Sequence, residues 1–190
     1  MAKKFLSMLL ALAMVMAMLA ACTTEPLDPV NPDDQQQEEV DKDSLQLIVD
    51  GASEYVIVRG ENASPSEVTA STELQKYLKQ ISGAELPIVT DSTAAVDKEI
   101  VVGKTNRETD GDFDREELGT DGFVIKTKDG KLWLVGGEKR GTLYSVYTFL
   151  EEYLGCRFYT ESFEKVPEQK TISLNIEENK QLPVFEVRNS

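Results

Sequence analysis

Residues 131–155 of the 190-residue chain read KLWLVGGEKRGTLYSVYTFLEEYLG. The apolar run at the start predicts a strand. The spacing of apolar residues in the remainder predicts a helix from about residue 140 to 154, with one apolar stripe formed by Leu143, Val146, Tyr147, Leu150 and Leu154. Gly136 and Gly137 allow the chain to leave the strand in a tight turn, and Gly141 allows the helix to start close to a sheet. The passage therefore predicts a helix packed on a sheet.

A second helix is expected before this passage, between Ser64 and Gly83. Ser64 can cap its start, Pro65 suits the first turn, and Glu67 completes a capping box. The glycine is a typical helix terminator. The apolar face of this helix is expected to consist of Val68, Leu74, Leu78 and Ile81, with Tyr77 beside them.

Short apolar runs on both sides of the two helices predict strands. They are residues 45–49, 55–58, 86–89, 99–103, 122–127, 131–136, 157–159 and 171–176. Two helices cannot cover both faces of so large a sheet. We therefore expect an α/β fold of the two-layer α+β type, with a mixed sheet and both main helices largely on one face. One turn of helix is also expected at 115–118, within the polar loop 105–121.

The first 21 residues predict export. Lys3 and Lys4 precede an apolar run of about 14 residues, too short for a transmembrane helix, which needs about 20. The run ends in Leu19-Ala20-Ala21-Cys22, which resembles the lipobox of bacterial lipoproteins. We expect residues 1–21 to be a lipoprotein signal peptide and Cys22 to carry a lipid anchor at the bacterial cell envelope or surface. The alternative is an ordinary Ala-x-Ala cleavage site followed by an incidental cysteine.

Residues 22–43 are rich in proline, glutamine and acidic side chains and contain few apolar residues. Such a segment cannot bury enough surface to offset its ordering entropy, so we expect a disordered acidic tether. An acidic cation-binding tail is the alternative. The folded domain is expected to occupy residues 44–182.

The composition excludes several classes of function. The chain has 20 Lys+Arg against 34 Asp+Glu, a net charge of −14, no His and 2 Cys. Nucleic-acid binding needs clustered cations, and the absence of His excludes Ser-His-Asp catalysis and His-ligated zinc. If Cys22 carries lipid, Cys156 has no disulfide partner in the chain, and its apolar neighbours predict a small buried side chain rather than a reactive thiol.

Four motifs in the second half resemble a known family. They are IVVGKTNR at 100–107, DGFVI at 121–125, VGGEKRGTLYSVYTFLE at 135–151 and LGCRFY at 154–159. Together they are similar to the small α/β domain that precedes the catalytic barrel in family 67 α-glucuronidases, and to the second domain of β-hexosaminidases. The resemblance extends over about residues 45–188.

The resemblance implies a non-catalytic role, because the catalytic carboxylates of that family lie on the (β/α)₈ barrel that follows. Residues 183–190 resemble the start of the link into that barrel, and a barrel of about 250 residues does not fit in this chain. We therefore expect an accessory domain of a lipid-anchored, cell-surface glycoside hydrolase in carbohydrate metabolism, with no catalytic residue and no cofactor of its own. A stand-alone surface lipoprotein that binds glycans or a protein partner is the alternative. The expected partners are the membrane, through the lipid, and a catalytic barrel or a glycan.

Individual side chains give weaker indications of function. Arg140 and Arg157 are candidates for contacts with a sugar carboxylate or with acids at a domain seam. The adjacent carboxylate pairs diverge by about 100° on a helix, so they do not form the pair that a glycosidase needs. Asp110, Asp112 and Asp114 resemble the start of a calcium loop, but Arg115 replaces the required glycine, so an acidic surface loop is the alternative.

The aromatic residues allow two interpretations. They could form a sugar-stacking platform, or they could pack in the core, where most of their positions on the expected elements would place them. The residues concerned are Trp133, Tyr144, Tyr147, Phe158 and Tyr159.

Overall fold

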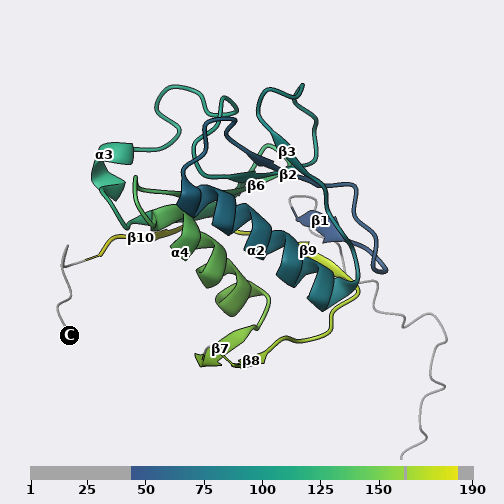
Figure 1. Cartoon of the computed structure of the whole chain (residues 1–190). Coiled ribbons are helices and arrows are strands. Elements are labelled where there is room, and N and C mark those ends of the chain that lie inside the picture. The colour runs from purple at the N-terminus through teal and green to yellow at the C-terminus, as the bar shows by residue number, and fades with distance from the viewer. Residues whose placement is uncertain (1–43, 161, 184–190) are drawn as a thin grey trace, which may run out of the picture. The chain divides into compact units, whose positions relative to one another are not determined.

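The computed structural model describes residues 44–160 and 162–183 (Figure 1). The expected signal peptide, Cys22, the tether and residues 184–190 lie outside the described residues. Two helices lie side by side against one face of a six-stranded sheet (Figure 1): α2 (Pro65–Ser82) and α4 (Gly141–Thr148), which continues as the π-helix η1 (Phe149–Tyr153). The two-layer arrangement expected from the sequence is thus confirmed.

The main sheet has the strand order β10-β5-β6-β4-β2-β3. Strands β2, β3, β4 and β6 are parallel, whereas β5 and β10 are antiparallel to their neighbours, so the sheet is mixed. The bounds are β2 (Val56–Arg59), β3 (Ile88–Thr90), β4 (Glu99–Val102), β5 (Phe123–Lys128), β6 (Lys131–Gly136) and β10 (Asn179–Gln181). Strand β4 lies within the run 99–103 that was expected to form a strand. It is central in the sheet, and all four of its residues are buried.

Two pairs of short strands lie outside the main sheet. Strand β1 (Leu45–Ile48) pairs with β9 (Ile172–Leu174), and β7 (Arg157–Thr160) pairs with β8 (Phe163–Lys165). Neither β8 nor β10 is among the strands expected from the sequence. Both are three residues long and largely exposed, so they lack the apolar runs by which strands are recognised.

The core lies between the sheet and the helices. Alternate residues of the central strands face α2 and α4, as the two-residue period of a strand requires. They include Ile57, Ile100, Val102, Ile125, Leu132 and Leu134, all with no exposed surface. From α2, Leu74, Leu78 and Ile81 enter this core. The expectation for Val68 was wrong: it is 38% exposed, and Ala70 and Ser71 occupy the buried face near the start of the helix.

The opposite face of the sheet is covered by the loop that contains α3 (Arg115–Leu118), the single turn expected from the sequence. Leu118 packs there with Val101, Trp133 and neighbouring valines. Phe113 lies against Trp133, with 5.4 Å between the ring centroids. Within the described residues, no helix is long and apolar enough to span a membrane.

One of the two long helices differs in its backbone geometry from the helix that the sequence predicts. Helix α2 has the full capping box of Ser64 and Glu67 and ends at Gly83 in the left-handed conformation, as expected. The helix expected at 140–154 is instead an eight-residue α-helix followed by a π-helical segment. The wider turn places Phe149 and Leu150 in the core, and both are fully buried.

Candidate functional site

The four parallel strands end along one edge of the sheet. The order in which strands are added to the sheet reverses at β2. From β2 the chain passes through α2 to β3 at the edge of the sheet, and then crosses to β4 on the other side of β2. In open α/β sheets, ligands bind beyond the carboxyl ends of the strands at such a switch point. A ligand site is therefore expected at this edge of the sheet.

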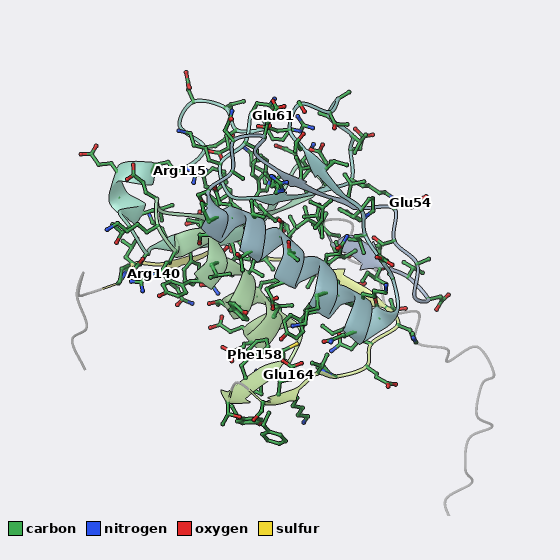
Figure 2. All side chains as sticks on the ribbon, in the orientation of Figure 1. Glu54, Glu61, Arg115, Arg140, Phe158 and Glu164 are labelled. Atoms are coloured by element: carbon green, nitrogen blue, oxygen red, sulfur yellow. The ribbon has the colours of Figure 1, made fainter. Side chains whose placement is uncertain are left out.

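A cleft of about 690 Å³ lies at this edge. The volume is in the range of ligand pockets, about 300 to 1,000 Å³. The loops after β2, β3, β4 and β6 all contribute to its lining, as does the start of α2. The lining consists of Gly60, Glu61, Asn62, Ser64, Glu67, Asp91, Lys104, Thr105, Asn106, Arg115, Gly136, Gly137 and Glu138. In Figure 2, Glu61 and Arg115 both lie among the loops on the upper side of the view.

Two carboxylates in the cleft hold its loops together. Glu67 accepts hydrogen bonds from the Ser64 N–H and the Lys104 N–H, each at 2.8 Å. Asp91 accepts from the Glu61 N–H at 2.8 Å and from the Asn106 N–H at 2.9 Å. Each carboxylate uses both oxygens to join two loops, so both act as structural acceptors.

Arg115 supports the floor of the cleft from the other side. Its guanidinium donates to the Gly136 carbonyl at 2.7 Å and forms an ion pair with Glu108. In residues 44–160 and 162–183, no hydrogen bond or ion pair engages the side chains of Glu61, Lys104 and Glu138. The cleft therefore offers one ammonium and two carboxylates to a small polar ligand.

None of these cleft residues was singled out from the sequence as a site residue. The available signal was a charged residue within three positions of the end of each expected strand, such as Glu61, Asp91 and Lys104. That signal becomes specific only once the strand order is known, because the order determines which carboxyl ends lie side by side.

The structure does not bring Arg140 and Arg157 together, since they lie at opposite ends of the α4–η1 helix. Arg140 forms a two-bonded ion pair with Asp121, at 2.7 and 3.2 Å, and lies over the Tyr144 ring. Arg157 donates to the main-chain carbonyls of Glu151 and Cys156, both at 2.6 Å.

The three aspartates of the suggested calcium loop make separate contacts. Asp112 accepts hydrogen bonds from Lys128 and Thr109, which hold the pKa of its carboxyl well below the usual range. Asp114 caps α3, and Asp110 is exposed. In the part of the chain that the structure describes, no group of three or more Asp, Glu, Cys or His side chains is arranged to hold a metal ion. Calcium binding at these residues stays a prediction.

The five aromatic residues separate into buried and exposed members. Trp133 is buried, and Tyr147 and Phe158 pack against the core. Tyr144 and Tyr159 are exposed and lie on different elements, so the five form no common platform. Cys156 is fully buried, and burial raises the pKa of its thiol to about 11, so the thiol stays protonated near neutral pH.

The described part of the chain is similar to known glycosidase domains. The family model described as "Glycosyl hydrolase family 67 N-terminus" matches residues 38–149, more than half of the chain. No curated protein matches the sequence.

The comparison with solved structures also found similar chains. One is a family GH115 4-O-methyl-α-glucuronidase with specificity for decorated arabinogalactans, at 16% identity and a TM-score of 0.48 over 74% of this chain and 18% of that one. The Streptomyces plicatus N-acetyl-β-hexosaminidase is 14% identical, with a TM-score of 0.44 over 69% of this chain and 22% of that one. The GH20 β-N-acetylhexosaminidase from Streptomyces coelicolor A3(2) is 15% identical, with a TM-score of 0.44 over 69% of this chain and 23% of that one. The chain thus spans about a fifth of the length of these proteins.

Proposed function

The chain belongs to the glycosyl hydrolase family 67 N-terminal family, and on this basis we propose that it is a non-catalytic accessory domain that works with the catalytic domain of a glycoside hydrolase. The observation that carries the proposal is the family match over residues 38–149, which includes both helices of the main layer up to Phe149. The catalytic partner is proposed to be of the α-glucuronidase type, as the resemblance in the sequence implies.

The contacts of the carboxylates support a non-catalytic role. Glycoside hydrolysis needs two carboxyl groups about 5 to 10 Å apart, one of them in an environment that favours its protonated form. In the cleft, Glu67 and Asp91 accept main-chain N–H groups with both oxygens. The buried Glu99 is paired with Arg107 and Lys131. Glu61 and Glu138 are exposed to solvent and are not enclosed in an apolar environment.

An activity assay tests the non-catalytic role. We expect the full chain to release no uronic acid from uronate-bearing oligosaccharides, even at micromolar protein and overnight incubation. Release above the buffer blank that disappears in the Glu61→Gln, Glu138→Gln double variant would overturn the proposal and place catalysis in the cleft.

The link to a catalytic domain is tested on the native protein. We expect the intact mass of the protein extracted from native membranes to exceed that of this chain by roughly 30 kDa or more, the size of a barrel. A mass that equals the mature chain plus lipid would favour the alternative, a stand-alone surface lipoprotein that binds glycans or a protein partner.

Lipid attachment at Cys22 is a separate proposal that rests on the Leu19-Ala20-Ala21-Cys22 motif. We expect metabolic labelling with a radioactive fatty acid to mark the wild-type protein and not the Cys22→Ser variant. The Cys156→Ser variant is the matched control, because it removes the other cysteine of the chain, and it should keep the label. Labelling that survives Cys22→Ser would place the lipid on another residue and overturn this proposal, and no labelling at all would favour the ordinary Ala-x-Ala cleavage site.

A further inference from the structure

The β7–β8 hairpin (Arg157–Thr160 and Phe163–Lys165) lies apart from the main sheet, beyond the end of α4 (Figure 1). One of its faces is packed on the helices. Phe158 meets the rings of Tyr77 and Tyr147 edge to face, at centroid distances of 5.2 and 5.1 Å. Glu164 accepts a hydrogen bond of 2.6 Å from the Tyr77 hydroxyl. Figure 2 shows Phe158 and Glu164 close together on this hairpin. These contacts fix the hairpin and leave its other face outward.

The outer face is defined by strand register. Directly opposed residues of an antiparallel pair share a face, and successive residues alternate. Phe158 is opposite Glu164 on the inner face, and Arg157 is opposite Lys165 on the outer one. The register shifts between Phe158 and Thr160, which leaves Tyr159 as an additional residue on its strand. Such a bulge redirects a side chain. Thr160 is opposite Phe163, so the outer face consists of Arg157, Tyr159, Thr160, Phe163 and Lys165.

Tyr159 and Phe163 form an exposed aromatic pair. Their rings are stacked, with centroids 5.4 Å apart and planes inclined by 26°. They are 59% and 63% exposed, more than any other large apolar side chain in the described ranges. The pair therefore offers a solvent-exposed ring surface, held by the fixed hairpin.

The charged side chains that the structure describes on the outer face, those of Arg157 and Lys165, are both positive, although the whole chain carries −14. Within the described residues, the Lys165 ammonium has no hydrogen-bond or ion-pair partner. The guanidinium of Arg157 is held by the carbonyls of Glu151 and Cys156 and still lies on an exposed residue. Among the described residues of the hairpin, the one carboxylate is that of Glu164, and it is on the inner face with Tyr77. Same-face neighbours on a strand are about 7 Å apart, so both cations lie next to the aromatic pair.

We propose that the outer face of the β7–β8 hairpin binds an anionic, uronic-acid-bearing polysaccharide. The apolar face of a sugar ring stacks on Tyr159 and Phe163, and the carboxylate of a uronic acid pairs with Lys165 and Arg157. A neutral glycan would need only the ring surface. The two cations beside it, on a protein that is acidic as a whole, favour a glycan that carries carboxylates. This inference needs neither the catalytic partner nor the lipid, so it can fail or succeed independently of the proposed function.

A protein partner fits this face less well. A stable protein interface buries about 1,200 to 2,000 Å² and has an apolar centre of many side chains. The outer face has two rings beside two cations, and its strands have four and three residues. A sugar chain can instead be held by a few stacked rings, each ring contact changing affinity by about twofold to tenfold.

Affinity electrophoresis tests the proposal. The protein is the full chain carrying Cys22→Ser, and the gels contain glucuronoxylan. The reference ligand is the same polysaccharide after its carboxyl groups have been reduced to neutral alcohols. We expect glucuronoxylan to retard the protein and the Tyr159→Ala, Phe163→Ala double variant to bind at least tenfold more weakly. Lys165→Ala should weaken binding to glucuronoxylan about fivefold and leave binding to the reduced polysaccharide unchanged.

The controls separate stacking from loss of structure. Tyr144→Ala removes an exposed aromatic side chain from α4, away from the hairpin, and should bind like the parent. The aromatic exchange Tyr159→Phe, Phe163→Tyr should restore most of the affinity lost in the alanine variant. The proposal is overturned by absence of retardation, by equal retardation of the double alanine variant, or by equal affinity for the reduced polysaccharide. Self-association in sedimentation that the alanine variant abolishes would also overturn it, in favour of a protein interface.

Discussion

Helices α2 and α4 begin at the same edge of the sheet, beside the same cleft, and start in different ways. Helix α2 carries its own start signal: Ser64 accepts from the Glu67 N–H, and Glu67 accepts from the Ser64 N–H. At the start of α4, Arg140 occupies the cap position without a side-chain cap hydrogen bond. The first helix is therefore specified by adjacent residues and the second by something else.

The start of α4 is specified by close approach to the sheet. A Cβ on Gly141 would overlap the Gly122 carbonyl oxygen, and a Cβ on Gly136 would overlap the main chain of Gly141 and Thr142. The two ends of the turn between β6 and α4 touch main chain to main chain. The two sides of the cleft therefore depend on different kinds of residue: capping side chains at the start of α2 and glycines at the start of α4.

The largest expected effect is that of Gly141→Ala. The added methyl group meets main-chain atoms that cannot rotate away, so we expect a loss of at least about 3 kcal/mol in the free energy of unfolding. Urea denaturation measures it. Tyr144→Ala, on an exposed position of the same helix, should lose less than about 1 kcal/mol. Similar losses for the two variants would show that close packing does not set the start of α4.

This contrast also explains what could be predicted from the sequence. The capping box and Gly83 gave both ends of α2 correctly, because these signals act within a few residues. The glycines of α4 indicated a tight turn, but nothing local indicated the change to a π-helix at Phe149. That change depends on fitting Phe149 and Leu150 into a core formed by distant strands.

The site residues follow the same rule. Asp91 and Lys104 are 13 positions apart along the chain, and only the strand order makes them neighbours in the cleft lining. Tyr159 was considered as part of a five-residue aromatic group, whereas its stacking partner is Phe163, on a strand that the sequence did not indicate.

Glu67→Ala is expected to have the next largest effect. Glu67 accepts the Ser64 N–H within the capping box and also the Lys104 N–H from the loop after β4. Loss of two hydrogen bonds to a charged acceptor should lower the free energy of unfolding by about 2 kcal/mol. Ser64→Ala removes one cap bond and should lose about 1 kcal/mol. If thermal and urea unfolding give equal losses for the two variants, the bond to the β4 loop contributes nothing.

The end of α2 offers a smaller test of local specification. Gly83 has a φ of +90°, a conformation that an alanine adopts only with strain. Gly83→Ala should therefore lower the free energy of unfolding by about 1 kcal/mol, and Gly83→Asn by less, because asparagine tolerates this region better. The measurement is the urea midpoint of both variants. A larger loss for asparagine than for alanine would contradict a purely conformational cause.

The smallest expected effect has the opposite sign and lies in the first turn of α4. The Thr142 side chain is 2% exposed, and within the described residues its hydroxyl oxygen has no hydrogen-bond partner. A buried hydroxyl without a partner is destabilising, and valine keeps the shape without the polar group. Thr142→Val should therefore raise the free energy of unfolding by up to about 1 kcal/mol, whereas Thr142→Ser, which keeps the hydroxyl and loses the methyl group, should lower it. A loss in the valine variant would mean that the hydroxyl is satisfied, and α4 would then have a polar anchor near its start after all. The starts of α2 and α4 would then differ less than proposed, because a side-chain hydrogen bond would stabilise the first turn of both helices.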